Sequence, residues 1–444
     1  MDVIVHTWDT LLFLLTGFSD KGVEQFVWKL FPYFLFLELP LYVFILLGIL
    51  KYYLRKDQII PENRPYYPTV SCIVTCYSEG EDIKKTIISL AEQIYEGHIE
   101  ILPIIDGARQ NENTYRAAKS MEIYVCKRPK RSLHVIPKWQ RGGKVSSLNI
   151  GLQFSTGEIV MSLDGETSFD NTMVSYATRH FENTDVVAVA GNLRVRNAFK
   201  NLATRLQAIE YQLSIHASKV GLNEFNAINC ISGAFGIFRK SFLKKIGGWD
   251  SGAAEDLDLT LRMKSYFGRY PRLKILFEPK AMGHTDAPET FRGLFDQRMR
   301  WDGDLFYLYV RKHYLSFNSH IFGWRALIIY VWTGLFFQLV MPFIIIIYSA
   351  YIFIVYPLGV VLAVYAMIYL AYLVITIIFY LVFLTMLSER RPEDLRLAVL
   401  LPIMPFYNFS LRVCNGIATL KSIFMKTHLD TSLEPWWVLR KTKF

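Results

Sequence analysis

Three acidic motifs in this chain are followed by a run that contains glutamine, arginine and tryptophan. The acidic motifs are Asp106-Gly107, Asp164-Gly165-Glu166 and Glu255-Asp256-Leu257-Asp258, and the run is Gln297-Arg298-Met299-Arg300-Trp301. A carboxylate can accept a proton from a reacting hydroxyl group, and a pair of carboxylates can bind a hard divalent cation. Arginine offers a planar pair of donors to a diphosphate. Together these residue types suit the transfer of a group from a donor that carries a diphosphate.

Each motif taken alone has a structural explanation that involves no chemistry. An Asp-Gly pair is common in turns, and an acidic run before the periodic segment 259–263 is typical of a helix N-terminus. Gln, Arg and Trp on one helical face also suit a helix that lies at a membrane surface. The chemical interpretation therefore depends on the occurrence of all four motifs in this order.

Asp164 and Glu166 are the candidate metal ligands. They stand two residues apart, and a nucleotide diphosphate needs a divalent cation to screen its charge. We expect Mg²⁺ or Mn²⁺ at this position. The loop Gln140-Arg141-Gly142-Gly143-Lys144 can approach the same nucleotide, although a Gly-Gly pair before a lysine is more often just a mobile loop.

Short β-rich runs alternate with helical stretches between about residues 68 and 288. This alternation predicts an α/β domain with a mostly parallel sheet and helices on both faces. Two of the expected strands lead into Asp106 and Asp164, and ligands gather at the carboxyl ends of strands in open α/β sheets. The expected strands are residues 70–76, 99–105 and 158–163, and a helix opens at 78–82.

The chain is too apolar for one soluble domain and too charged in its middle for a bundle of membrane helices. Its 444 residues are 52% hydrophobic and 20% charged, and the mean hydropathy is +0.23. A soluble domain mounted on membrane helices accounts for both properties. The net charge of +10 suits basic cytoplasmic loops and contacts with lipid head groups, so it does not indicate nucleic-acid binding.

Long apolar runs lie on both sides of the predicted soluble domain. Residues 31–53 are long enough to cross the hydrocarbon layer, and the cations that follow predict a cytoplasmic location for the next segment. Residues 324–386 predict a helical hairpin broken at Tyr356-Pro357-Leu358-Gly359. The block 397–424 contains prolines, asparagines and an arginine, so it is either a kinked span or a re-entrant segment. The shorter apolar run at 8–18 is interpreted as interfacial.

A longer set of residues carries a resemblance to a known family. The set comprises Ile73-Val74-Thr75-Cys76-Tyr77 with Glu79, Asp106-Gly107, Gly143-Lys144 with Leu148-Asn149, Asp164-Gly165-Glu166, Ser232-Gly233-Ala234-Phe235, Glu255-Asp256-Leu257-Asp258 and Gln297-Arg298-Met299-Arg300-Trp301. It resembles the processive inverting family 2 glycosyltransferases that build cellulose, poly-N-acetylglucosamine, chitin and hyaluronan. The resemblance covers nearly the whole chain and implies an α/β, nucleotide-sugar-binding glycosyltransferase A-type domain mounted on α-helical transmembrane segments.

The resemblance implies roles for residues on the donor side. Asp106 would hold the uracil or ribose end of a UDP-sugar, and Lys144 and Asp258 would also contact the substrate. Asp164 with Glu166 would bind the metal and the diphosphate. The family usually has aspartate where this chain has Glu166, so this carboxylate lies one methylene further out.

The resemblance also implies a catalytic set. Asp256 would be the general base, with Glu255 as a supporting carboxylate. Gln297, Arg300 and Trp301 would lie over the diphosphate and the acceptor sugar at the mouth of a channel. Inverting transfer needs a base for the acceptor hydroxyl and positive charge for the departing diphosphate, and this set supplies both.

These residues imply an inverting hexosyl- or N-acetylhexosaminyltransferase with a UDP-sugar donor. It would polymerise glucose or N-acetylglucosamine into a β-linked exopolysaccharide and translocate the polymer across the membrane. The alternative is a non-processive glycosyltransferase acting on a lipid acceptor, and a third hypothesis is a non-catalytic subunit that kept the fold. Polar residues in the block 401–415 suit a channel and favour the processive enzyme, and the retained carboxylates argue against the non-catalytic subunit.

The expected partners are the UDP-sugar donor, the growing polysaccharide, the lipid bilayer and an accessory membrane or export subunit. The expected location is a bacterial inner or plasma membrane, with several spans and a cytoplasmic catalytic domain. The expected segments are 1–56 (interfacial segment and transmembrane anchor), 57–287 (cytoplasmic glycosyltransferase domain), 288–323 (amphipathic interfacial helices with the Gln-x-x-Arg-Trp motif), 324–426 (C-terminal transmembrane helices) and 427–444 (basic tail).

Overall fold

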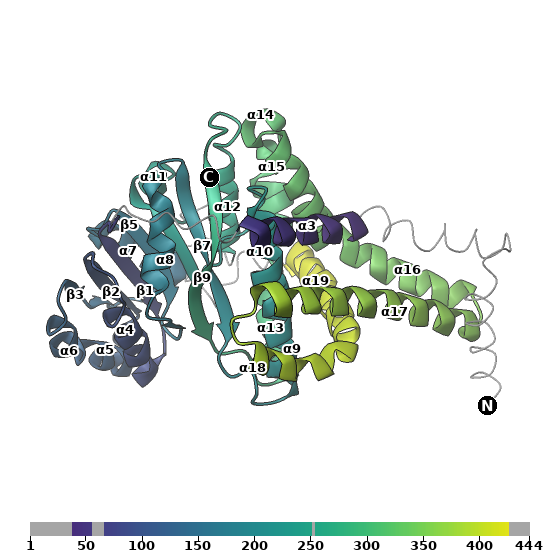
Figure 1. The fold of residues 1–444 in the computed structure, drawn as a ribbon, viewed down its shortest axis with the longest axis horizontal. Helices are drawn as coiled ribbons and strands as arrows, with labels where there is room; N and C mark the ends of the chain where they lie inside the picture. The colour runs from purple at the N-terminus through teal and green to yellow at the C-terminus, as the bar shows by residue number, and fades with distance from the viewer. Residues whose placement is uncertain (1–37, 56–65, 251–253, 426–444) are drawn as a thin grey trace.

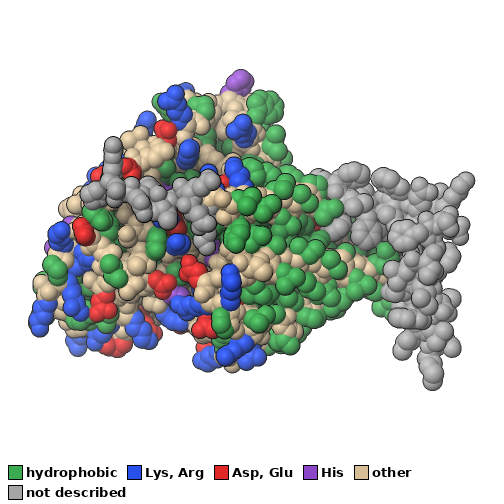
Figure 2. Space-filling view, viewed as in Figure 1, with side chains coloured by type: hydrophobic (Ala, Val, Ile, Leu, Met, Phe, Trp, Pro, Cys, Tyr) green, Lys and Arg blue, Asp and Glu red, His purple; other side chains and the backbone are tan. Residues whose placement is uncertain are grey.

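The structure is a computed structural model that describes residues 38–55, 66–250 and 254–425. An α/β domain forms one half of the molecule, and long helices extend from it on the other side (Figure 1). Hydrophobic side chains cover the surface of the extended helices, whereas Lys, Arg, Asp and Glu side chains gather on the α/β domain (Figure 2). This distribution matches the predicted arrangement of a soluble domain mounted on membrane helices.

A nine-stranded mixed sheet forms the centre of the α/β domain within the described residues. The strands are β1 (Val70–Cys76), β2 (Ile99–Asp106), β3 (Arg131–Leu133), β4 (Ile136–Lys138), β5 (Ile159–Asp164), β6 (Ser168–Phe169), β7 (Val186–Val195), β8 (Phe235–Arg239) and β9 (Lys274–Thr285). The order is β3-β2-β1-β5-β8-β7-β9-β6, and β4 also pairs with β2. Strands β3, β2, β1 and β5 are parallel, as are β7 and β9, and β8 is antiparallel to both of its neighbours. The prediction of a mostly parallel sheet is confirmed.

Strands β1, β2 and β5 were all expected from their apolar runs, and they are almost entirely buried. A strand covered on both faces by helices has this continuous burial. Strand β5 begins one residue later than predicted, and the carboxyl ends of β2 and β5 each lie one residue further along, because Asp106 pairs with Lys138 of β4 and Asp164 pairs with Thr75 of β1. Both aspartates are therefore the last residues of their strands.

Short helices connect and cover the strands, and α7 packs on β1 and β2 while α8 packs on β9. The predicted helix at 78–82 begins as a 3-10 turn, η3 (Gly80–Asp82), and continues as α4. The other helices of the domain are α4 (Ile83–Ala91), α5 (Glu112–Lys119), α6 (Glu122–Cys126), α7 (Gly143–Phe154), α8 (Met173–Thr178), η4 (Arg179–Glu182), α9 (Leu202–Glu210), η5 (Tyr211–Ala217), α10 (Ser218–Asn223), α11 (Lys240–Lys245) and α12 (Glu255–Lys264).

Three long apolar helical runs lie in the C-terminal part, at 324–355, 358–387 and 391–425, and each is long and apolar enough to cross a membrane. The first contains α15 (Trp324–Ile329), η8 (Tyr330–Val340) and α16 (Met341–Val355); the second contains α17 (Leu358–Val382) and η9 (Phe383–Leu387); the third contains α18 (Arg391–Leu397), η10 (Ala398–Ile403) and α19 (Met404–Met425).

The predicted hairpin break is confirmed at Tyr356 and Pro357. Pro402 lies within the 3-10 segment η10, so the last block is a helix with an irregular turn at its proline.

Shorter helices precede the first long run: α13 (Phe291–Asp302), η6 (Tyr307–Lys312), η7 (Tyr314–Ser316) and α14 (Ser319–Phe322). Helix α3 (Leu39–Arg55) covers most of the first predicted span, whose residues 31–37 lie outside the described part of the chain. The interfacial run at 8–18 and the basic tail at 427–444 also lie outside it.

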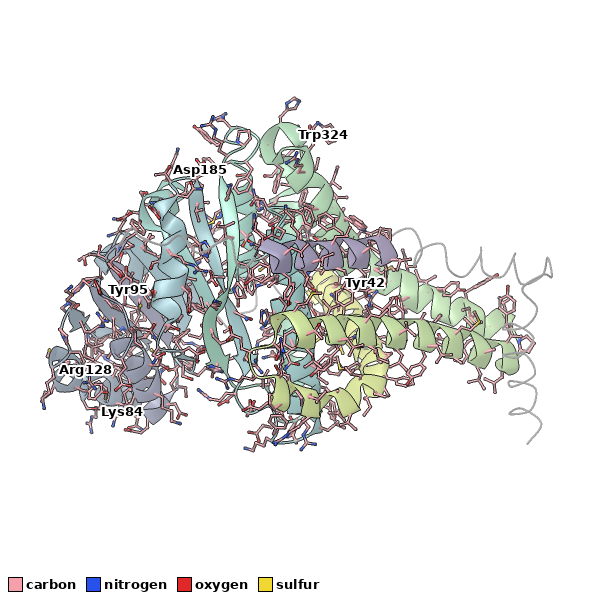
Figure 3. The ribbon with its side chains drawn as sticks, viewed as in Figure 1. Tyr42, Lys84, Tyr95, Arg128, Asp185 and Trp324 are labelled. Atoms are coloured by element: carbon pink, nitrogen blue, oxygen red, sulfur yellow. The ribbon has the colours of Figure 1, made fainter. Side chains whose placement is uncertain are left out.

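Helix α3 joins the long helices to the α/β domain. Near its start, Tyr42 makes an edge contact with Phe379 of α17, with ring centroids 5.4 Å apart, and Tyr42 is labelled among the long helices in Figure 3. Further along, a Cβ on Gly48 would lie 2.1 Å from the carbonyl oxygen of Gly221 in α10. Two glycines thus let the backbones of α3 and α10 approach closely, as small residues do at helix crossings.

Candidate active site

The predicted site residues of the sheet meet at the carboxyl ends of β1, β2 and β5. Thr75 pairs with Asp164, and Cys76 pairs with Ile105, the residue before Asp106. Parallel pairing aligns these strand ends on one edge, where ligands bind in sheets of this kind. The expectation that Asp106 and Asp164 share an edge is therefore confirmed.

Lys144 links Asp164 at the sheet edge to Glu255 of α12. Its Nζ lies 2.8 Å from Oδ1 of Asp164 and 3.3 Å from Oε1 of Glu255. The sequence suggested a loop here, but Gly143 and Lys144 form the first turn of α7, and Gly143 has φ of +80°, which favours glycine. Burial alone would lower the pKa of Lys144, but Asp164 and Glu255 outweigh it and raise that pKa. Lys144 is therefore a fixed cation among carboxylates.

Asp106 holds the start of α7 in place. Its Oδ1 accepts hydrogen bonds from Lys138 Nζ at 2.6 Å and from the Gly142 amide at 2.8 Å, and its Oδ2 accepts one from the Gly143 amide at 2.9 Å. A carboxylate at the amides of a helix N-terminus is favoured by the helix dipole. Asp106 thereby positions the segment that carries Lys144.

Glu255 and Asp256 open helix α12, as the structural explanation of this motif predicted. The Gly233 amide donates to Asp256 Oδ2 at 3.1 Å, and the Leu257 amide donates to Asp256 Oδ1 at 2.7 Å. A Cβ on Gly233 would lie 2.7 Å from Glu255 Oε1, so only glycine fits here without a shift. Burial raises the pKa of Glu255 to about 7, although Lys144 opposes the shift. This helix terminus is therefore part of a group of charged side chains, Lys144, Asp164, Glu255 and Asp256, which we call the acidic cluster.

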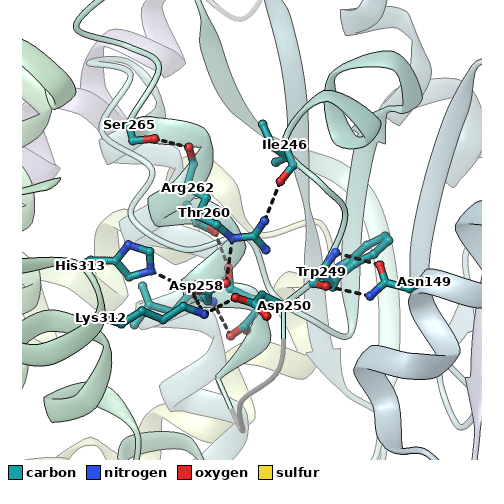
Figure 4. A network of polar contacts seen from close by, with 12 residues as sticks. Asn149, Ile246, Trp249, Asp250, Asp258, Thr260, Arg262, Ser265, Lys312 and His313 are labelled. Carbon is teal, nitrogen blue, oxygen red and sulfur yellow. Dashed lines mark hydrogen bonds and ion pairs between the residues drawn. The ribbon is translucent and has the colours of Figure 1, made fainter. Parts of the chain in front are cut away.

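Asp258 lies in a separate network on the other side of α12 (Figure 4). Its carboxylate contacts His313 at 2.7 Å, Lys312 at 2.8 Å and Arg262 at 2.9 Å, and its side chain is 1% exposed. Burial alone would raise the pKa of Asp258, but these three partners outweigh it and hold the pKa well below its usual range. Lys312 also pairs with Asp250 at 2.7 Å. The network ties α12 to η6, and the predicted contact of Asp258 with substrate stays a prediction.

Carboxylates near Asp164 form the candidate cation site. Glu166 is exposed, two residues beyond β5. Glu79 lies beside Gly165, and its Oε2 is buried without a hydrogen-bond partner. Among the described residues, no three His, Cys, Asp or Glu side chains are grouped to hold a metal. Asp164 and Glu166 have the oxygen donors that hard cations prefer, but a cation here needs further ligands from a bound diphosphate and water.

Helix α13 carries the Gln-Arg-x-Arg-Trp run. Trp301 is 42% exposed, and the guanidinium of Arg298 lies 4.7 Å from the centre of its ring. Arg300 is exposed, and Gln297 has a buried Oε1 without a partner. Within the described part of the chain, no hydrogen bond or ion pair joins Gln297, Arg300 or Trp301 to the acidic cluster.

Sequence reasoning missed the role of Arg298. Its Nη2 pairs with Glu210 Oε1 of α9 at 2.6 Å, and Glu210 Oε2 accepts a hydrogen bond from Tyr407 of α19 at 2.7 Å. This chain of contacts fixes α13 between the α/β domain and a long apolar helix, and it orients Arg298 over Trp301. The arginine was visible in the motif, but Glu210 and Tyr407 are too distant in sequence to signal their contact with it.

Comparison with solved structures supports the fold. A mannosyltransferase from Pyrobaculum calidifontis, in complex with GDP-Man and Mn²⁺, matches with a TM-score of 0.52. The match covers 87% of this chain and 99% of that chain, at 16% sequence identity. At this identity the similarity bears on the fold alone, and it agrees with a glycosyltransferase A-type domain.

Two curated relatives from staphylococci have the same name. A poly-beta-1,6-N-acetyl-D-glucosamine synthase of Staphylococcus epidermidis is 29% identical over 278 residues, which are 61% of this chain and 64% of the relative. The synthase of the same name from Staphylococcus aureus is 30% identical over 233 residues, 52% of this chain and 53% of the relative. The matches thus span less than two thirds of either relative.

A family model described as "Glycosyltransferase like family 2" matches residues 68–303. This range is more than half of the chain, and it contains every predicted site residue from Asp106 to Trp301. The chain therefore belongs to glycosyltransferase family 2.

Proposed function

We propose that this protein is a membrane-embedded enzyme that transfers N-acetylglucosamine from a UDP-sugar to a growing β-linked polymer. The observation that carries the proposal is the cluster in which Lys144 bridges Asp164 of the sheet edge and Glu255 of α12, with Asp256 beside it. Such a cluster places a cation and a base next to each other where a nucleotide would bind. The names of the staphylococcal relatives support N-acetylglucosamine as the sugar.

The transfer proceeds by single displacement at the anomeric carbon of the donor. The acceptor hydroxyl oxygen forms the new bond to this carbon as the bond to the diphosphate breaks, and the hydroxyl proton passes to Asp256. The Gly233 and Leu257 amides fix the Asp256 carboxylate in position. The charges of Lys144 and Arg300 stabilise the UDP that leaves, because fixed positive groups act where negative charge develops.

Asp164 and Glu166 are the residues that would hold a divalent cation. When bound, Mg²⁺ or Mn²⁺ would screen the charge of the diphosphate. We expect Asp164→Asn to impair activity more than Glu166→Gln, since Asp164 also holds Lys144. Titration of activity with each metal measures this order, and full wild-type activity in excess chelator contradicts the assignment.

The acceptor side is assigned to α13. Trp301 would stack on the acceptor sugar, Gln297 would offer its unpartnered oxygen, and Arg300 would reach the diphosphate. Because α13 packs against α19, an acceptor held there lies beside an apolar helix that is long enough to span a membrane. This arrangement supports delivery of the polymer into the helices.

We retain the sequence-based division into an anchor (1–56), a catalytic domain (57–287), interfacial helices (288–323), C-terminal spans (324–426) and a tail (427–444). The long apolar helices support a location in a membrane, and the staphylococcal relatives support a bacterial inner or plasma membrane. The cations that follow the first predicted span favour the cytoplasmic side for the catalytic domain. An accessory export subunit remains a candidate partner.

The test is product analysis with purified full-length protein in detergent or nanodiscs. We expect UDP release and an N-acetylglucosamine polymer with UDP-N-acetylglucosamine, and much less product with UDP-glucose, as measured by mass spectrometry. Asp256→Asn protein is the background control. A single sugar attached to a lipid would favour the lipid-acceptor alternative, and no UDP release above the control with either donor would refute the proposal.

A further inference from the structure

A large cavity lies away from the acidic cluster, between the first described helix and the first long C-terminal helix. It has a volume of about 1210 Å³, above the roughly 300–1,000 Å³ of most small-molecule sites. One wall is α3, the opposite wall is the run from α15 into η8, and α10, β9 and η4 supply the floor. The cavity is therefore bounded by two helices of the membrane part and by the edge of the α/β domain.

The two helical walls have the same gradient from apolar to basic. On α3, Leu41 and Phe44 come before Lys51 and Arg55, and on α15 and η8, Arg325 comes before the apolar side chains. Since the charges lie at the domain-facing end of both helices, the walls run antiparallel. Leu41 and Arg55 are separated by 14 steps along the helix, which at 1.5 Å rise per residue extend over roughly 20 Å. The apolar lining residues of the second wall are Ile328, Ile329 and Trp332.

The basic end carries more cations than its carboxylates can balance. Glu224 pairs with Lys51 and Arg55, and Glu278 pairs with Arg179 and His180. Both of these carboxylates are buried, with side chains that are 0% and 2% exposed.

Three more lining cations, Lys274, Lys280 and Arg325, have no ion pair within the described residues, and Lys280 lies over the ring of Tyr176 at 5.3 Å. Glu182 is a further anion at the rim, but it is exposed and unpaired with them. The surplus charge at this end is positive.

Aromatic and charged residues mark the level of this basic end relative to a membrane. Trp324, at the start of α15, is 70% exposed, and it is labelled at the outer end of that helix in Figure 3. An exposed tryptophan next to an arginine at the end of an apolar helix is typical of the lipid head-group region. The basic end thus lies at head-group depth, and the apolar end points toward the hydrocarbon.

We propose that this cavity binds one anionic phospholipid of the cytoplasmic leaflet. The phosphate lies at the basic end, which Lys274, Lys280 and Arg325 help to line, and the acyl chains lie along Leu41, Phe44 and the apolar face of α15 and η8. A soluble nucleotide would leave the apolar half unfilled, and a basic peptide would meet like charge at the other half. The inference is independent of the proposed catalytic function, because no residue of the acidic cluster lines the cavity.

Native mass spectrometry of the full-length protein in detergent tests the proposal, with phosphatidylglycerol as the probe. Phosphatidylcholine is the uncharged lipid control, and glycerol 3-phosphate is the soluble head-group control. We expect one tightly bound phosphatidylglycerol, weaker binding of phosphatidylcholine, and no displacement by glycerol 3-phosphate. The variant with Lys274→Gln, Lys280→Gln and Arg325→Gln should bind phosphatidylglycerol about 100-fold more weakly, because each basic residue near the surface contributes to anionic-lipid binding.

A matched variant with Lys84→Gln, Lys85→Gln and Lys119→Gln removes the same charge from the far end of the domain, where Figure 3 labels Lys84. It should bind phosphatidylglycerol like the wild type. A second variant, Ile328→Trp, fills the apolar half without changing charge and should also weaken binding, so the test holds if the triple variant does not fold.

Equal binding by the two triple variants overturns the proposal. So does displacement of the lipid by glycerol 3-phosphate, since it would show an anion site without acyl-chain contacts. The thermal midpoint of each variant without added lipid confirms that it is folded.

Discussion

Two clusters of charged side chains lie on helix α12, and they differ in how far protein groups balance their charges. In the first, Lys144 stands between Asp164 and Glu255, and the Lys144 and Asp164 side chains are 34% and 29% exposed. In the second, Asp258 is 1% exposed and has three basic partners. In the first cluster the carboxylates outnumber the cations. In the second, the cations Lys312 and Arg262 balance the carboxylates Asp258 and Asp250.

This difference in charge balance and exposure distinguishes a cluster that can bind a ligand from a network that stabilises the fold. A partly exposed cluster with surplus negative charge can bind a cation or a proton. A buried network whose charges are already paired has no surplus charge with which to bind one. Asp256 and Asp258 fall into different clusters because two residues on an α-helix are rotated by about 200°. The same contrast holds on α13, where Arg300 is exposed and Arg298 is paired with Glu210.

Asp256→Asn should produce the largest loss of activity. The amide keeps the size of the side chain but cannot accept the proton of the acceptor, and a general base contributes about 10²- to 10⁴-fold in rate. Radiolabelled sugar incorporation measures the loss, and UDP binding by calorimetry should stay within a few fold. Near wild-type turnover would move the base to Glu255.

Arg300→Lys should reduce polymer yield by roughly 10- to 100-fold, because lysine cannot reproduce the planar fork that binds a diphosphate. Arg298→Lys is the matched control on the same helix, and we expect only a few-fold loss since lysine can still pair with Glu210. Sugar incorporation per monodisperse protein compares the two. If the Arg300→Lys protein is fully active and the Trp301→Ala protein folds poorly, the run from Gln297 to Trp301 serves as a membrane anchor instead.

Asp258→Asn should destabilise the protein and leave the activity of the folded fraction within a few fold. Removing one partner of a buried ion pair typically costs about 3–5 kcal/mol. The folded pKa of Asp258 is depressed, so its stabilisation is complete above the unfolded value of about 3.9 and is lost as the pH falls through the folded pKa. Thermal unfolding in detergent measures the loss. An unchanged midpoint with abolished activity would instead place Asp258 in contact with substrate.

The pH dependence of activity tests the first of the two clusters without the loss of any side chain. The pKa of Glu255 is raised to about 7, so the side chain is neutral below that pH and charged above it. If its charge holds Lys144, activity should fall by about tenfold for each pH unit below 7. The pH profile of Glu255→Gln should lack this limb, and an unaltered acid limb in that variant assigns it to another group.

The amino-acid sequence alone determined the family, the order of the motifs and the main elements. Strands β1, β2 and β5 were predictable because a strand buried on both faces is a continuous apolar run. The hairpin break at Pro357 was predictable because proline ends a helix locally. The acidic start of α12 was predictable because the helix dipole favours carboxylates there. All of these signals act over a few residues.

Tertiary structure alone decided which charged groups are open to a ligand. Asp258 has one local partner, Arg262 one turn further along α12, but the partners that set it apart from Asp256 are Lys312 and His313 at the end of η6, more than fifty residues along the chain. Likewise, the Gly-Gly-Lys segment was expected as a loop, and it is helical because Asp106 of a distant strand accepts hydrogen bonds from the Gly142 and Gly143 amides. Long-range contacts of this kind depend on how the sheet and helices pack, and packing is a property of the whole fold that a short motif does not encode.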